Sequence, residues 1–128
     1  MKTILEADFC AAAILISFGA ILGKVSIFQL FVYASMEVFF YALNFSIITY
    51  IFKAYDVGGT MLIHVFGVYF GLASLFFFNP KAACEEGRRE KPLDRGNYLS
   101  DLVSMTGTLF LFCYWPSFNS ALVTGSSQ

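Results

Sequence analysis

Residues 56–78 read DVGGTMLIHVFGVYFGLASLFFF, and this stretch decides the fold class. After its first residue, Asp56, it contains no acidic residue, lysine or arginine, and its single histidine is His64. Its length is close to the ~20 residues that cross a ~30 Å hydrocarbon core as a helix. It does not alternate polar and apolar residues as a half-buried strand does. The stretch therefore predicts a membrane-spanning helix.

The rest of the chain has the composition of a membrane protein. Of its 128 residues, 58% are hydrophobic and only 13% are charged, whereas soluble domains carry about a quarter charged residues. A core of this size could not hide 16 phenylalanines and 7 tyrosines from water. The net charge of −1 gives no basic surface for nucleic acid. We therefore expect a lipid bilayer as the main partner and no nucleic acid.

Four apolar segments predict an all-α, multi-pass integral membrane fold. The expected transmembrane helices span about 7–22, 27–52, 58–78 and 102–123. The polar connection 79–101 carries five of the eight basic residues. Because basic loops remain on the cytoplasmic side of a membrane, we expect this loop to be cytoplasmic. The start of the first helix and the end of the fourth then face outside.

His64 is the main candidate for a functional residue. At ~1.5 Å per residue it is expected on the order of 10 Å inside the membrane from the outer end of its helix. An ionisable residue at that depth is costly and marks a candidate functional site, although it could also serve only as an interhelical hydrogen bond. Gly67 and Gly71 share its helical face and allow close helix approach. We therefore expect His64 to face a helix interface or a narrow lumen.

Further candidates follow from position. Gly19 and Gly23 repeat the same small-residue spacing in the first segment and predict a packing face there. Asp56 is expected to cap the helix that follows it, and it could also shape an outer vestibule. Phe9 and Phe118 are expected on the outer side, with His64 deeper, as in a gated apolar channel.

The three cysteines, Cys10, Cys84 and Cys113, have no spacing that indicates a disulfide framework or a zinc site. We expect no metal ion, no cofactor and no enzymatic activity.

Several stretches of the sequence resemble the ammonium transporter and Rhesus glycoprotein family, the Rhesus branch in particular. The matching stretches are ADFC at 7–10, FGAILGKVS at 18–26, DVGGTMLIHVFGVYFGL at 56–72, SDL at 100–102, GTLFL at 107–111 and YWPSFNSA at 114–121. The resemblance implies a subunit of about eleven or twelve transmembrane helices, assembled as a trimer with one pore per subunit. The four helices expected here look like the third to sixth of that core, so residues 1–128 read as a partial domain, an internal fragment.

The resemblance also implies roles for individual residues. His64 matches the first of two pore histidines, and Phe9 and Phe118 match the paired phenylalanines over the extracellular mouth. Asp56 matches an acid that shapes the outer pore, and Asp101 matches an acid near the cytoplasmic exit.

The resemblance bears on three further positions. Asn119, in the YWPSFNSA stretch, is assigned to the vestibule or its support. Two positions depart from the family pattern. Phe45 stands where an acid is common, and Phe112 stands where a tryptophan is common.

The implied function is ammonium transport by the full-length parent protein in the plasma membrane, with neutral ammonia conducted after ammonium loses its proton. Methylammonium and carbon dioxide are further candidate species. The expected assembly is a homo- or hetero-trimer of full-length subunits. One alternative function is that of a non-transporting Rhesus-like membrane structural partner. Another is a small four-helix membrane scaffold. We expect no transport from the 128 residues alone.

Overall fold

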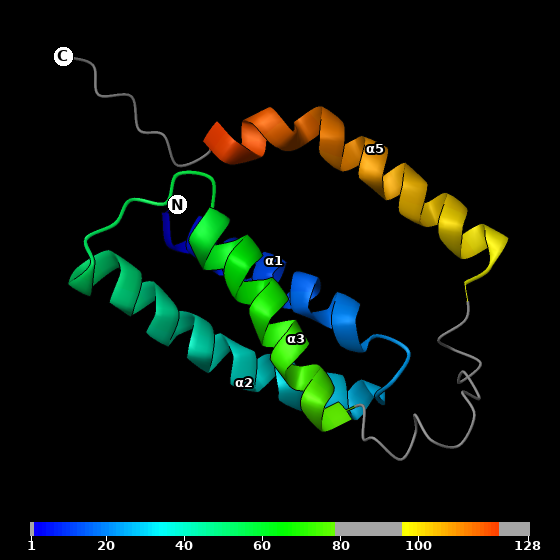
Figure 1. Ribbon diagram of the computed structural model, residues 1–128. Coiled ribbons are helices and arrows are strands. Elements are labelled where there is room, and N and C mark those ends of the chain that lie inside the picture. The colour runs from blue at the N-terminus through cyan, green and yellow to red at the C-terminus, as the bar shows by residue number, and fades with distance from the viewer. Residues whose placement is uncertain (1, 79–95, 121–128) are drawn as a thin grey trace.

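The computed structural model describes residues 2–78 and 96–120, which are almost entirely helical (Figure 1). The elements are α1 (Lys2–Ile21), α2 (Ile27–Ser46) with the π-helical turn η1 (Ile47–Ile51), η2 (Thr60–Val65) with α3 (Phe66–Phe78), and α5 (Tyr98–Ser120). These described residues include no strand. The prediction of an all-α fold with four helical segments is therefore confirmed.

Helices α1, α2 and α3 form a bundle, and α5 runs along its side. In Figure 1, α1 and α3 run in one direction, whereas α2 and α5 run in the other. Most of the packing in the bundle joins α1 to α3. Along α5 the side chains are exposed except at Phe118 and Asn119, which are half-buried. Helix α5 therefore meets the bundle only near its C-terminal end.

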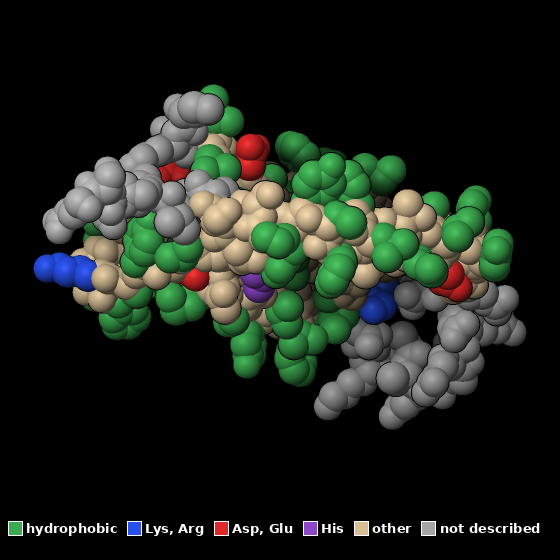
Figure 2. Space-filling view, turned by 90° about the horizontal axis from the view of Figure 1, so that it is seen from above, with side chains coloured by type: hydrophobic (Ala, Val, Ile, Leu, Met, Phe, Trp, Pro, Cys, Tyr) green, Lys and Arg blue, Asp and Glu red, His purple; other side chains and the backbone are tan. Residues whose placement is uncertain are grey.

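Three stretches of the described chain are long and apolar enough to cross a membrane: Ile4–Ile21, Ile27–Ile51 and Thr60–Phe78. Helix α5 is not among them. Hydrophobic side chains are spread along the whole length of the face shown in Figure 2, and charged side chains on it are few. In a bilayer such exposed apolar surface faces lipid or other helices instead of water, so the chain is a membrane protein.

Two helices begin earlier than the sequence pattern predicts. Helix α1 starts at Lys2 instead of residue 7, because Glu6 and Asp8 remain exposed on its first turns and do not end it. Helix α5 starts at Tyr98 instead of residue 102, because the Asn97 side chain accepts a hydrogen bond from the Ser100 backbone N–H at 2.9 Å. The other parts of the predicted connection and of the fourth helix, 79–95 and 121–123, lie outside the described residues.

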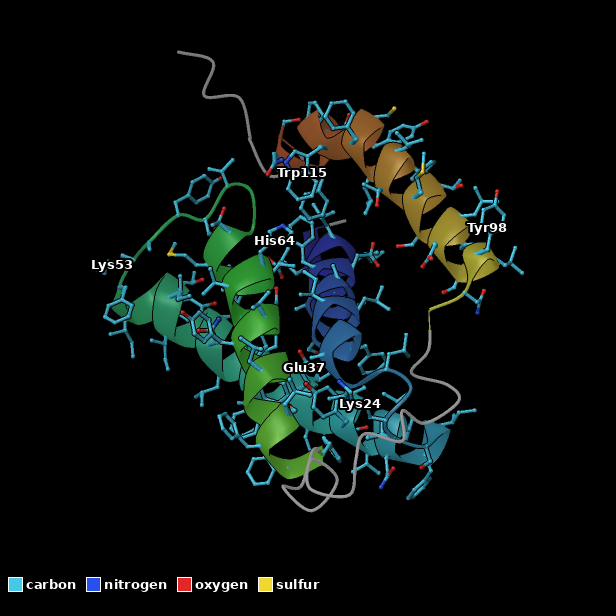
Figure 3. All side chains as sticks on the ribbon, turned by 45° about the vertical axis from the view of Figure 1, so that its right-hand side comes forward. Lys24, Glu37, Lys53, His64, Tyr98 and Trp115 are labelled. Carbon is cyan, nitrogen blue, oxygen red and sulfur yellow. The ribbon has the colours of Figure 1, made fainter. Side chains whose placement is uncertain are left out.

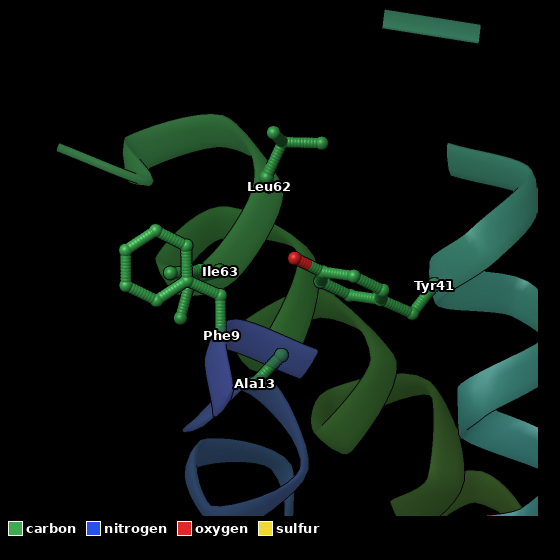
Figure 4. Close-up of a cluster of buried hydrophobic side chains, with 5 residues drawn as sticks. All are labelled: Phe9, Ala13, Tyr41, Leu62 and Ile63. Atoms are coloured by element: carbon green, nitrogen blue, oxygen red, sulfur yellow. The ribbon is translucent and has the colours of Figure 1, made fainter. Parts of the chain in front are cut away.

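The core of the bundle lies near one end, between α1, α2 and η2. It consists of Phe9, Ala13, Tyr41, Leu62 and Ile63 (Figure 4). Ala13 and Ile63 have no exposed surface. This cluster fixes the start of η2 against α1 and so fixes the helix that carries the histidine.

Below this core the backbones of α1 and α3 are in close contact. A Cβ atom added at Gly67 would lie 2.7 Å from the Ala13 carbonyl oxygen, and one added at Gly71 would lie 2.9 Å from the Ser17 carbonyl oxygen. Real side chains do not fit at such distances. Glycine at these two positions therefore permits the close helix packing that the spacing predicts.

Neither glycine of the corresponding pair in α1 packs against another helix within the described residues. Gly19 is exposed, and apart from its chain neighbours and the nearby backbone of α1 no heavy atom of the described residues lies within 4 Å of the position of an added Cβ. Gly23 lies beyond the end of α1 in a turn with φ of 79°, a conformation that glycine adopts without strain. The face of α1 that meets α3 is the one with Ala13 and Ser17. Spacing alone could not select between the two faces, because both carry small residues.

Candidate functional site

Asp56 organises the start of the helix that carries His64. Its carboxylate accepts hydrogen bonds from the backbone N–H groups of Thr60 at 2.9 Å, Met61 at 2.8 Å and Leu62 at 2.8 Å. The first N–H groups of a helix have no partner within it, and an aspartate ahead of the helix satisfies them. Asp56 therefore caps the helix, as the sequence predicts.

The turn that follows is wider than an α-helical turn. Gly59 has φ of 68°, and its carbonyl accepts hydrogen bonds from both Ile63 N–H at 2.8 Å and His64 N–H at 3.1 Å. The bond to His64 spans five residues, as in a π-helix. His64 thus projects from a π-helical turn at one end of the bundle, and such turns are frequent at functional sites.

The His64 ring lies among aromatic side chains of α5. Its centroid is 5.3 Å from that of Trp115 and 6.1 Å from that of Phe118 (Figure 3). The side chain is half-buried, and its Nε2 atom is buried with no hydrogen-bond partner among the described residues. A buried ring nitrogen without a partner costs free energy. A small guest molecule that forms a hydrogen bond with this nitrogen, as donor or as acceptor, would remove that cost.

Two phenylalanines complete the group of rings. Phe9 of α1 is 7% exposed, and its centroid is 5.4 Å from that of Phe118. Trp115 stacks on Phe118 at 5.6 Å with an interplanar angle of 18°. We refer to Phe9, Trp115 and Phe118 together as the aromatic cluster. It draws on α1 and α5, and His64 of η2 lies against it.

Sequence reasoning missed the contribution of Trp115, because a tryptophan near a helix end is usually an interfacial residue. Trp115 precedes Asn119 by four residues, and this spacing could have placed both side chains on one face of α5. The Asn119 side-chain amide donates to the Trp115 carbonyl oxygen at 3.0 Å. Asn119 also fills the space beside Gly58, where an added Cβ would collide with its amide oxygen. Asn119 thus supports the end of α5 at this site.

Asp101 lies far from Asn119 and from the aromatic cluster. It is exposed in the first turn of α5, at the opposite end from Asn119. Asn119 follows Asp101 by eighteen positions along the helix, which is about 27 Å at ~1.5 Å per residue. Within residues 2–78 and 96–120, no group of three or more His, Cys, Asp or Glu side chains could hold a metal ion.

Glu37 is a further residue that sequence reasoning missed. It lies in the middle of α2 and has no exposed surface, and Ser17 Oγ of α1 is 2.5 Å from its Oε2 atom (Figure 3). The available signal was a single acid within an apolar run of membrane-spanning length, which by itself marks a candidate site.

Comparison with known proteins shows the family of the chain. The sequence profile of the Ammonium Transporter Family matches residues 1–128. The chain belongs to the ammonium transporter family. It is 46% identical over 119 residues to "Ammonium transporter Rh type A" of Mus musculus, covering 92% of this chain and 26% of that protein.

Other relatives also belong to the Rh branch. The chain is 42% identical over 130 residues to "Ammonium transporter Rh type B" of Pongo pygmaeus, covering 100% of this chain and 26% of that protein. It is 42% identical over 129 residues to "Ammonium transporter Rh type C" of Pongo abelii, with coverage of 100% and 26%. The chain therefore spans about a quarter of the length of these curated relatives. The resemblance to the Rhesus branch is confirmed.

Proposed function

We propose that this chain forms part of an ammonium conduction path in a longer transporter, and that His64 and the aromatic cluster lie at its outer entrance. Two findings support the proposal. Relatives that match the whole chain are named ammonium transporters. The one histidine has a buried, unpartnered Nε2 atom beside Trp115 and Phe118.

The chemistry of the entrance favours neutral ammonia as the conducted species. Moving a cation into an apolar lumen costs many kcal/mol, whereas neutral ammonia has no such cost. The pKa of ammonium lies roughly two units above neutral, so deprotonation at pH 7 costs about 3 kcal/mol. Losing the proton is therefore the cheaper route, and ions such as sodium, which carry no removable proton, are excluded.

Different residues of the site attract the cation and handle its proton. The faces of Phe9 and Phe118 attract an arriving cation through their π-electrons. His64 Nε2 then accepts a hydrogen bond from ammonium, or donates one to ammonia. The imidazole takes up the proton that ammonium loses and returns it to the water outside the entrance. Methylammonium fits the same chemistry, and carbon dioxide is a further small neutral candidate. We further propose that the full-length protein assembles as a trimer in the plasma membrane.

The unpartnered His64 Nε2 atom carries the proposal, and its replacement tests it. In the full-length protein, His64→Ala is expected to lower methylammonium flux by about tenfold, which corresponds to about 1.4 kcal/mol in the barrier. Thr106→Ala is a suitable control, because Thr106 is exposed and its hydroxyl bonds only the Leu102 carbonyl of its own helix. Flux and selectivity that are unchanged in His64→Ala would refute the role.

A further inference from the structure

Glu37 has no part in the proposed path, yet it is the only carboxylate with no exposed surface among the described residues. It lies within the membrane-spanning stretch Ile27–Ile51. Its Oε1 atom has no hydrogen-bond partner in the described chain, and its Oε2 atom meets only the Ser17 hydroxyl. An ionised carboxylate in such surroundings is very costly, because neither water nor a full set of donors compensates its charge.

The number of hydrogen atoms at Ser17 indicates whether Ser17 or Glu37 donates the hydrogen bond between them. Ser17 Oγ lies 2.9 Å from the Ile14 carbonyl oxygen and 2.5 Å from Glu37 Oε2. A serine hydroxyl has one hydrogen but two acceptor lone pairs. Both short contacts are satisfied when Ser17 donates to Ile14 and accepts a hydrogen from Glu37. That arrangement requires Glu37 to carry a proton.

The bond has a consequence for the rotation of α1. In lipid there is no hydrophobic force that selects which apolar face of a helix turns inward, and Leu15 is 70% exposed while Ala13 and Ile21 are fully buried. A polar group selects a face, because Ser17 reaches Glu37 in one rotation only. Phe9, Ala13, Ser17 and Ile21 form one buried row at four-residue spacing. A hydrogen bond that fixes the position of Ser17 therefore also fixes the direction in which the Phe9 side chain points.

A second polar contact holds α2 in the matching orientation. Tyr33 and Ser74, which are 7% and 8% exposed, have their hydroxyl oxygens 3.0 Å apart and join α2 to α3. Tyr33 precedes Glu37 by one helical turn, so both contacts come from the same face of α2. Together they tie α2 to both of its neighbours.

We propose that Glu37 is a proton-bearing positioning residue whose hydrogen bond to Ser17 fixes the rotation of α1 and thereby holds Phe9 against Phe118. The transport consequence rests on the proposed function, whereas the protonated carboxyl group and its bond to Ser17 do not.

Infrared spectroscopy of the full-length protein at neutral pH tests the protonated state. The spectrum of the wild type minus that of Glu37→Gln is expected to contain the carbonyl stretch of a protonated carboxylic acid. Ser17→Ala should shift this band, since it removes the hydrogen-bond acceptor. Ser35→Ala is the matched control, because Ser35 is exposed and bonds only the Phe31 carbonyl at 2.9 Å. Bands of an ionised carboxylate in place of the carbonyl stretch would overturn the proposal, whether or not the protein transports ammonium.

Methylammonium flux tests the positioning role. Glutamine keeps a neutral donor at this position, so Glu37→Gln should retain wild-type flux within about twofold. Glu37→Leu should lower the flux by about threefold, the population change expected for one average interhelical hydrogen bond in a membrane. The exposed Glu6 provides the control Glu6→Gln. A Leu variant as active as wild type would overturn the positioning role, and a transport-negative wild type would overturn the proposed function instead.

Discussion

The Phe9 and Phe118 rings, which come from the first and last described helices, have centroids 5.4 Å apart and planes inclined at 58°. This pair joins α1 to α5 at the end of the bundle where His64 lies. Apart from Phe118 and its neighbour Asn119, the residues of α5 are exposed. The attachment of α5 within this chain therefore depends on very few side chains, and each of them touches the proposed entrance.

Phe118→Ala in the full-length protein is expected to weaken methylammonium binding. It removes one aromatic face from the entrance and the contacts with Phe9 and Trp115. Loss of a cation–π contact of about 0.5–1 kcal/mol should raise the apparent KM by about two- to fivefold. Phe112→Ala is the control, because Phe112 is 80% exposed on the same helix. Equal KM values for the two variants would contradict a role for Phe118 in cation capture.

Asp56→Ala is expected to destabilise the protein by about 1–2 kcal/mol, because three backbone N–H groups lose their acceptor. Asp56→Asn should retain most of the stability, since asparagine also caps helices. Thermal unfolding in detergent measures both effects. Asp101→Ala serves as a control at an exposed position. If Asp56→Asn lost flux while it kept its melting temperature, Asp56 would act on the cation as well as on the helix.

Gly67→Ala and Gly71→Ala are expected to destabilise the bundle by about 1–3 kcal/mol each. The added methyl groups would meet the carbonyl oxygens of Ala13 and Ser17, and a backbone cannot move aside as a flexible side chain can. Gly107→Ala is the control, since an added Cβ there has open space, and alanine is the better helix former. A melting temperature of Gly67→Ala at or above that of wild type would show that α1 and α3 are not in close contact.

The contact between Gly58 and Asn119 predicts coupling between two substitutions. Gly58→Ala alone places a methyl group on the Asn119 amide and should push the end of α5 outward. Asn119→Ala removes the obstructing side chain, so the double variant should lose less stability than the sum of the single variants. Thermal unfolding of the four proteins gives the interaction free energy, expected at roughly 0.5–3 kcal/mol. Strict additivity would mean that the two residues do not touch.

Much of the fold follows from the sequence, because long apolar runs near 27–52 and 58–78 leave few alternatives to membrane helices. The capping by Asp56 also follows, since it depends on residues close in the chain. The earlier start of α5 at Tyr98 was missed, because the asparagine cap lies within a polar stretch that gives no apolar periodicity.

The relations between helices were harder to predict. Gly19 and Gly67 have the same kind of spacing, but only Gly67 meets another helix within the described chain, and the choice depends on how α1 is rotated. The partners of Glu37 and Trp115 lie on other helices, so no local pattern reveals them. The π-helical turn that contains His64 was also unpredicted, and its Ile63 side chain packs in the core against residues of α1 and α2.

The π-helical turn η2 holds one extra residue just ahead of the site. Each residue of a helix advances the side-chain direction by about 100°, and a π-helical turn holds one residue more than an α-helical turn. Deleting one residue between Thr60 and Ile63 would restore regular helical winding, and the imidazole would keep nearly its present direction relative to the Asp56 cap, because one full turn still separates His64 from Gly59. A deletion in a regular α-helical turn would instead rotate all later side chains by about 100°, so the wide turn is the place in this helix where a change of one residue in chain length disturbs the entrance least.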